Sequence, residues 1–165
     1  IYGISGFGLA RQLGCDVPAA NAYIRQYMER FPELAAYMEE TKAEAARDGY
    51  VTTAFGRRIV IHGAQDKNAA RRAFAARQAI NAPIQGTDAD LMKIAMAQVP
   101  DALRAAGMRA RLLLQVHDEL VLEAPADEAQ KAADLVRQVL QAAAAPFHVP
   151  ITASAGIADN WDDAH

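Results

Sequence analysis

The segment LLLQVHDELVLEAP, residues 112–125, places one imidazole and two carboxylates between two apolar runs. If these runs pair as an antiparallel hairpin, His117 and Asp118 form its two-residue turn. Favoured turns of this length need positive φ at both central positions and usually contain Asn-Gly or Asp-Gly. Backbone strain of this kind tends to persist where the placement of a side chain matters. Acidic residues are also common in turns because their side chains are well solvated. The segment alone therefore allows both a functional and a purely structural turn.

The chemical interpretation of this turn is a metal ligand. A carboxylate at the end of a rigid apolar hairpin can bind Mg²⁺, which prefers hard oxygen ligands and leaves room for phosphate and water. Asp118 and Glu119 are neighbours along the chain, so their side chains point to opposite faces of the hairpin. We therefore expect one of them, and not both equally, to be the metal ligand. A two-metal site needs a further carboxylate from another element, and no other acidic residue is an obvious partner.

A second candidate site lies within residues 71–93. Arg77 and Asn81 are four residues apart and therefore share one face of a helix. Gln85 follows four residues later and joins that face if Pro83 only kinks the helix. These side chains suit phosphates, sugars and base edges, but any half-buried helix shows a similar polar stripe.

Basic residues are concentrated in the middle of a chain whose formal net charge is −3. Between residues 57 and 77 six basic residues face Asp66 alone, a local balance of +5. Clustered cations suit the phosphates of a polyanion, and charge alone equally allows a solvated helix face. The six are Arg57, Arg58, Lys67, Arg71, Arg72 and Arg77.

The composition indicates an ordered globular chain of 165 residues, 52 % of them hydrophobic and 22 % charged, about one domain in length. A single cysteine, Cys15, excludes an internal disulfide framework and favours a reducing, cytoplasmic setting. No apolar run approaches the roughly 20 residues needed to cross a bilayer, and the start lacks a signal-peptide pattern. The first residue, Ile1, gives the expectation that the chain is cut from a longer one.

Periodicity and turn residues predict an α+β fold in which helices and antiparallel strands occupy separate blocks. Asp16 is the expected N-cap of the first helix, whose aromatic stripe of Tyr23, Tyr27 and Phe31 is expected in the core. Helices are predicted at residues 16–31, 32–48, 68–106 with an interruption near Pro83, and 126–144. Strands are predicted at residues 50–61 as a short hairpin turning at Phe55-Gly56, then at 109–116, 119–124 and 151–157.

Four segments together resemble family A DNA polymerases, the bacterial DNA polymerase I group. They are IYGISGFGLARQL, RQAINAPIQGTDADLMK, LLLQVHDELVLE and the ending GIADNWDDAH, so the resemblance covers the whole chain. It implies the C-terminal part of a right-hand polymerase fold, with fingers helices and a palm antiparallel sheet with packed helices. Residues 1–67 would belong to the fingers subdomain and residues 68–165 to the palm subdomain.

The resemblance also implies roles for individual residues. Asp118 matches the palm carboxylate that holds the two catalytic Mg²⁺ ions, and Glu119 matches its acidic neighbour. No residue is assigned to any other cofactor. The matches to DNA-contacting positions are His117 near the primer terminus, Tyr2 at the template insertion position, Arg77, Asn81 and Gln85 along the primer–template, and Arg71 and Arg72 at phosphates.

The implied reaction is template-directed DNA synthesis, in which a primer 3′-hydroxyl attacks the α-phosphate of a deoxynucleoside triphosphate. The other metal-binding aspartate and the residues that grip the triphosphate are expected upstream of Ile1, so the chain alone is predicted to be inactive. The implied partners are primer–template DNA, deoxynucleoside triphosphates and the remainder of the polymerase chain, with no membrane. The parent is expected to be monomeric, cytoplasmic and nucleoid-associated in bacteria.

Two rival functions remain. In a non-catalytic nucleic-acid-binding module, the basic residues between Arg57 and Arg77 would contact phosphates, and the hairpin would have only a structural role. A metal-dependent nuclease would need a second carboxylate cluster, which the sequence does not show.

Overall fold

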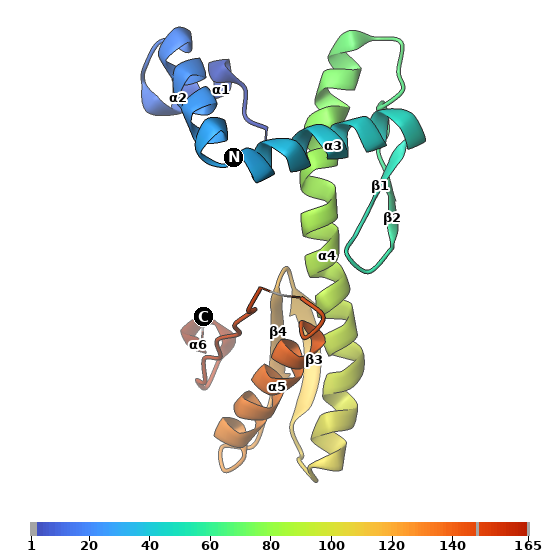
Figure 1. Cartoon of the computed structure of the whole chain (residues 1–165). Coiled ribbons are helices and arrows are strands. Elements are labelled where there is room, and N and C mark those ends of the chain that lie inside the picture. Colours follow the sequence, from blue (N-terminus) through green and yellow to red (C-terminus); the bar gives the residue numbers. More distant parts are fainter. Residues whose placement is uncertain (1–2, 148, 165) are drawn as a thin grey trace. The chain divides into compact units, whose positions relative to one another are not determined.

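The computed structural model describes residues 3–147 and 149–164 and divides into two compact units, Ile1–Thr87 and Asp88–His165. Each unit is α+β, and helix α4 supplies residues to both (Figure 1). The helices are α1 Gly6–Leu13, α2 Val17–Arg30, α3 Pro32–Asp48, α4 Ala69–Ala105, α5 Ala129–Ala143 and α6 Trp161–Ala164. The strands are β1 Tyr50–Thr52, β2 Arg58–Val60, β3 Arg111–Val116 and β4 Glu119–Glu123.

In the first unit, α2 begins and α3 ends where the sequence predicts. The Asp16 carboxylate accepts a hydrogen bond of 2.7 Å from the backbone N–H of Ala19, which confirms the expected N-cap of α2. Gly49, with φ of 77°, ends α3 in the left-handed conformation that glycine adopts most easily. These local caps fix where α2 begins and where α3 ends.

Helix α1 was not expected, because its eight residues include two glycines, which are poor helix formers. The Ser5 hydroxyl caps it by accepting a hydrogen bond of 3.1 Å from the N–H of Gly8. A Cβ atom at Gly6 would overlap the Asn21 side chain of α2. The glycine therefore allows α1 and α2 to approach closely, and packing overrides the weak intrinsic propensity.

The aromatic stripe of α2 is exposed, so its expected place in the core is wrong. Tyr23 is 53 % exposed, Phe31 is 45 % exposed, and Tyr27 is half-buried with its ring 4.8 Å from that of Phe31. The fully buried residue of α2 is instead Ala20. The helix packs through a small-residue face, which leaves its aromatic face without a cover among the described residues.

Strands β1 and β2 form the predicted short antiparallel hairpin, with Val51 opposite Ile59. Val51 is completely buried and packs in one apolar cluster with Ala45 of α3 and with Ala75 and Ala79 of α4. Burial of these alanines directs one face of α4 into the core. The opposite face of the same helix is consequently turned outward.

Helix α4 continues through Pro83 as one helix, so of the two outcomes expected at this proline, a kink or the start of a new helix, the second is wrong. A proline inside a helix lacks the N–H that would bond to the carbonyl four residues earlier. Donors from other elements bind carbonyls on either side of it: the Tyr37 hydroxyl donates to the Ile80 carbonyl and the Arg57 guanidinium donates to the Gly86 carbonyl, both at 2.9 Å. These contacts hold this part of the helix in place.

Gly86 lets the β1–β2 hairpin lie directly against α4. A Cβ atom at this position would collide with Ile59 and would lie 2.8 Å from the Thr53 methyl carbon. Any larger residue would therefore push the hairpin away from the helix. The glycine is required by close packing and not by its backbone conformation.

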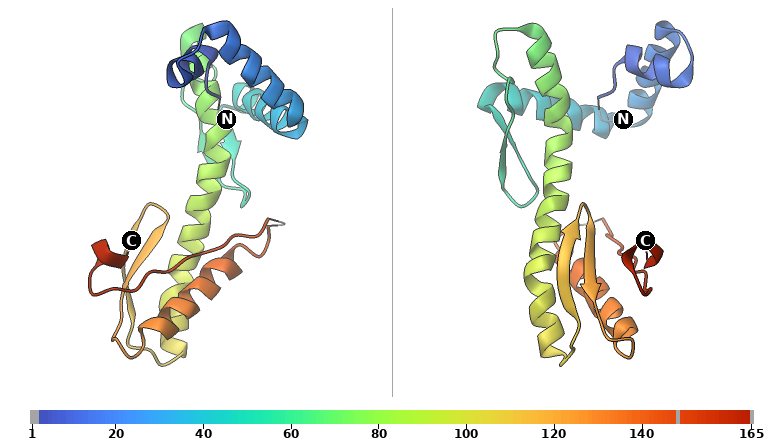
Figure 2. Two further views of the ribbon diagram at one scale, coloured as in Figure 1. Left: turned by 90° about the vertical axis from the view of Figure 1, so that its left-hand side faces the viewer. Right: turned by 180° about the vertical axis from the view of Figure 1, so that it is seen from behind.

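In the second unit, the β3–β4 hairpin lies beside the second part of α4 and α5 (Figure 2). Its core contains Val99 and Leu103 from α4 and Ala132 and Val136 from α5, and Leu112 of β3 packs against it. The strands are antiparallel and carry a bulge at residues 112–114. The hairpin thus rests on a packed apolar base, as the two apolar sequence runs predict.

The strand predicted at residues 151–157 is absent, because this segment pairs with no described strand. β-rich composition does not form a strand without a partner edge. No helix among residues 3–147 and 149–164 combines the length and apolar character that a membrane span requires.

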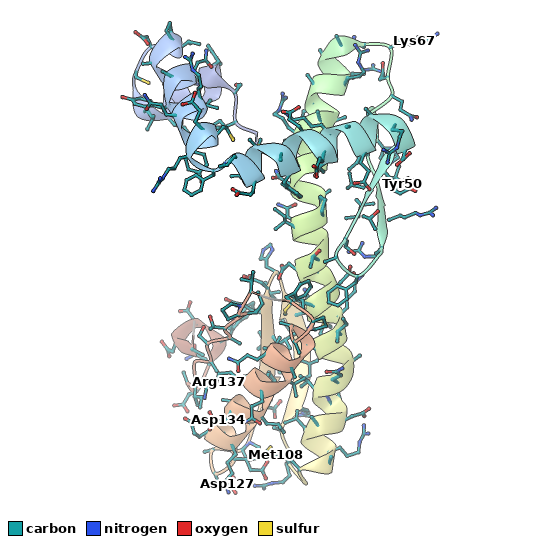
Figure 3. All side chains as sticks on the ribbon, viewed as in Figure 1. Tyr50, Lys67, Met108, Asp127, Asp134 and Arg137 are labelled. Atoms are coloured by element: carbon teal, nitrogen blue, oxygen red, sulfur yellow. The ribbon has the colours of Figure 1, made fainter. Side chains whose placement is uncertain are left out.

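Arg109, just before β3, is bound to the start of α5. Its backbone N–H and its Nε each donate a hydrogen bond of 2.8 Å to the Glu128 carboxylate, and its Nη2 donates to Asp127. Asp127 and Met108 lie together at one end of this unit (Figure 3). Hydrogen bonds from Arg109 hold the pKa of Glu128 below its ordinary value.

We expect the stabilisation from Glu128 to depend on pH. Because the folded-state pKa is lowered, the contribution is complete above the unfolded value of about 4.3 and is lost as pH falls through the folded value. Glu128→Gln should lower the thermal midpoint at neutral pH, and the difference from wild type should shrink at roughly pH 3. Asp127→Asn is the matched control and should have a smaller effect, because Asp127 is 73 % exposed against 19 % for Glu128. An equal difference at both pH values would contradict this assignment.

Candidate functional site

The β3–β4 hairpin ends in a two-residue turn formed by His117 and Asp118, as predicted, with Val116 opposite Glu119 as the last pair. His117 has φ of 53° and is the one non-glycine residue with positive φ in the described chain. Positive φ at both turn positions was expected, and this is wrong for Asp118. Positive φ at the first central position alone is the pattern of a type II′ turn, which usually has glycine there.

The turn exposes the Asp118 side chain to solvent. His117 and Asp118 are exposed and Glu119 is half-buried. No hydrogen bond or ion pair engages the Asp118 carboxylate within the described part of the chain. The Gln115 amide donates a hydrogen bond of 2.6 Å to the His117 carbonyl and braces the strained residue. The carboxylate oxygens of Asp118 are therefore held on a firm support and remain open to a ligand.

The hairpin can supply one ligand of a magnesium site. An exposed carboxylate without a protein partner is the hard oxygen ligand that Mg²⁺ prefers. Among residues 3–147 and 149–164, no group of three or more His, Cys, Asp or Glu residues is placed to hold a metal ion. Asp118 can therefore serve as a single ligand, and the other oxygens must come from water, substrate or other residues.

Three predicted residues, Arg77, Asn81 and Gln85, share the outward face of α4, which we call the polar face. They follow one another at spacings of four residues. Because the helix does not end at Pro83, Gln85 lies on the same face as the other two. Arg77 and Gln85 are exposed, while Asn81 is half-buried. The Asn81 Oδ1 atom is buried and has no donor in the described part of the protein.

Arg71 and Arg72 organise the start of α4. Arg71 forms an ion pair of 3.1 Å with Asp66, and Arg72 donates to the carbonyls of Asp66 and Lys67. A hydrogen bond from the backbone N–H of Asn68, followed by the Arg71 side chain, holds the pKa of Asp66 below its ordinary value. Both arginines stay exposed, and the Lys67 side chain extends outward from the loop before α4 (Figure 3).

The structure groups the predicted residues into two sets. Arg71, Arg72 and the polar face belong to the first unit, and residues 117–119 belong to the second. Tyr2 lies outside the described residues. Its neighbour Gly3 lies against the polar face, since a Cβ atom there would be 3.4 Å from Arg77 Cγ and 3.2 Å from Ile80 Cδ1.

Sequence reasoning missed Phe74, which lies on the same outward face of α4. The Arg77 guanidinium stands 5.7 Å from the centre of its ring. The signal was available, because Phe74 precedes Arg77 by three residues, a spacing that places both on one side of a helix. Its exposure could not be predicted from that spacing.

The chain matches the model of the family described as DNA polymerase family A over residues 1–163. It is 49 % identical to DNA polymerase I of Pseudomonas aeruginosa over 165 residues, which is 100 % of this chain and 18 % of that protein. It is 48 % identical to DNA polymerase I of Chloroflexus aurantiacus over 99 % of this chain and 17 % of that protein. The chain thus spans less than a fifth of these relatives.

A solved structure has the same fold. The POL domain of Pol1 from M. smegmatis, in complex with DNA primer-template and dNTP, superimposes with a TM-score of 0.92 at 40 % identity. The alignment covers 99 % of this chain and 29 % of that one. The predicted fold class, part of an α+β polymerase fold, is confirmed. The chain belongs to DNA polymerase family A.

Proposed function

We propose that this chain is the part of a DNA polymerase that carries one metal-binding carboxylate and a primer–template contact surface. The reaction is template-directed transfer of a nucleotide from a deoxynucleoside triphosphate to a primer 3′-hydroxyl. Family membership and the solved relative, which was captured with DNA primer-template and dNTP, support it. In this proposal residues 1–67 form part of the fingers and residues 68–165 part of the palm.

Asp118 is the proposed metal ligand and the first catalytic residue of this chain. Two Mg²⁺ ions, when bound, would activate the primer hydroxyl and stabilise the leaving oxygen. Glu119 is the proposed acidic neighbour that supports Asp118, and His117 is proposed to lie near the primer terminus. The observation that carries the proposal is the exposed carboxylate of Asp118, which has no partner among the described residues and sits on a strained, braced turn.

The first unit supplies the proposed DNA contacts. Arg77 and Gln85 project from the polar face of α4, and the buried Asn81 oxygen lacks a donor among the described residues. Arg and Lys side chains position nucleic acid through phosphates, while amides suit base edges in the minor groove. Arg71 and Arg72 are proposed to contact phosphates, and Tyr2 is proposed to stack at the template insertion position.

The second metal-binding carboxylate and the groups that grip the triphosphate are proposed to come from the remainder of the polymerase. The parent protein is proposed to act as a monomer in the bacterial cytoplasm, at the nucleoid. Half of a metal site does not provide the preorganised field that phosphoryl transfer needs.

The 165-residue chain alone is therefore expected to extend no primer. The measurement is a primer-extension assay with Mg²⁺ and all four deoxynucleoside triphosphates, in which the whole polymerase containing this chain is the positive control. Extension by the whole protein should follow the template sequence when single nucleotides are omitted. Incorporation by the isolated chain would refute the divided metal site, and a whole protein that only binds DNA would favour the non-catalytic module.

A further inference from the structure

An aromatic ring extends the polar face of α4 by one turn. Phe74 is 55 % exposed and precedes Arg77 by three residues, so it lies in line with Arg77, Asn81 and Gln85. The core of this unit takes Ala75 and Ala79 from the opposite face of the helix. Packing within the described first unit therefore does not account for a phenylalanine at this position.

Charged and polar side chains lie near Phe74, and the cations Arg71 and Arg77 are among them. Its ring borders a shallow pocket of about 540 Å³ whose other walls include His62, Asp66, Asn68 and Arg71. The Arg77 guanidinium lies 5.7 Å from the ring centre, at a distance typical of a cation–π contact. An apolar ring within a basic, polar rim is the combination that single-stranded nucleic-acid sites use, with aromatic faces for bases and cations for phosphates.

We propose that Phe74 is a stacking platform for an unpaired template base, and that Arg71 and Arg77 contact the phosphates next to that base. This inference rests on the proposed function. In that function the paired primer–template follows Asn81 and Gln85, and Tyr2 marks the insertion position. Gly3, next to Tyr2, lies against Arg77. Phe74 lies one turn beyond Arg77, on the side away from Gln85, where the template is still single-stranded.

A nucleic-acid base suits this surface better than an apolar protein segment. Besides Gly63 and Ala70, the pocket contains the Asp66 carboxylate and the Arg71 guanidinium, and an apolar segment would have to bury these ionised groups. Charge also favours DNA, because Arg71, Arg77 and the outward Lys67 outnumber the single carboxylate of Asp66. Stacking is tolerant of sequence, as a template contact must be, since every base has a π-face.

The test compares two DNA ligands bound to the whole polymerase, one with a 5′ template overhang and one a blunt duplex with the same paired region. Phe74→Ala should weaken binding of the overhang ligand roughly tenfold and leave binding of the blunt duplex unchanged. Phe74→Trp should retain wild-type affinity for both. Tyr23→Ala is the matched control, because Tyr23 is a helix-borne aromatic with 53 % exposure on α2, outside the proposed surface.

An abasic site, placed at each overhang position in turn, identifies the stacked nucleotide. At one position it should weaken binding of the wild type about as much as Phe74→Ala does, and it should have no further effect on the variant. Equal loss for overhang and blunt ligands, no loss at all, or a loss matched by Tyr23→Ala would overturn the inference alone. A wild-type protein that binds no primer–template would overturn the proposed function and this inference with it.

Discussion

Asp118→Asn in the whole polymerase should lower kcat for primer extension by at least roughly a thousandfold, while the affinity for primer–template is kept. Removing one preorganised charge from a site where charge develops in the transition state costs about 10²–10³ in rate, and loss of a metal ligand adds to this. The change keeps the size of the side chain and removes only the negative charge. Single-turnover extension together with DNA binding by anisotropy separates the two effects.

The same substitution should leave folding intact. Asp118 is exposed and forms no hydrogen bond or ion pair with the other described residues, so its charge holds no part of the fold together. Asp159→Asn is the matched control, because Asp159 is also an exposed aspartate without such a contact in the described chain. Extension within tenfold of wild type would remove Asp118 from the metal site. A DNA-binding module without catalysis would show no extension before or after the change.

The hairpin could be predicted from the sequence because its signals are local. Apolar runs on both sides of His117 and Asp118 predict the strands and the two-residue turn, and the structure confirms both. The backbone of Asp118 was predicted wrongly, because two turn types share this length and differ in which central residue has positive φ. The choice between them depends on backbone details that residue types other than glycine do not reveal.

Errors at the two ends of the chain have a different cause. Helix α1 forms despite its two glycines, Gly6 and Gly8, and close packing against Asn21 favours glycine at the first of them. Residues 151–157 have the composition of a strand but no partner edge among the described strands. Both outcomes depend on contacts between segments, and a local pattern contains no information on them.

The same distinction applies to the candidate site. The spacing of Arg77, Asn81 and Gln85 predicted a common face, but the hydrogen bonds donated to α4 near Pro83 come from Tyr37 and Arg57, which are distant in sequence. No spacing rule connects these donors to the carbonyls that they bind. The sequence therefore predicted which side chains form the polar face, but not the tertiary contacts that hold this part of the helix in place.

Arg77→Ala is the second change with a large expected effect, this time on DNA affinity. Arg77 is exposed, its guanidinium lies 5.7 Å from the centre of the Phe74 ring, and it forms no ion pair with another described residue. Loss of a charge-assisted contact to a phosphate should weaken primer–template binding roughly tenfold. The logarithm of the binding constant should also fall less steeply with the logarithm of salt concentration, by about 0.9 in slope, because one fewer counterion is released.

Arg104→Ala on the same helix is the matched control, since Arg104 is an exposed arginine that pairs with Asp101 away from the polar face. It should change neither the affinity nor the slope. The salt series decides between two explanations of weaker binding by Arg77→Ala. A contact with phosphate changes the slope along with the affinity, whereas a shift of the helix lowers affinity at every salt concentration by the same factor. Parallel salt dependences for wild type and Arg77→Ala would therefore place Arg77 away from the DNA backbone, and Asn81 and Gln85, which share its face, would lose their support as DNA contacts.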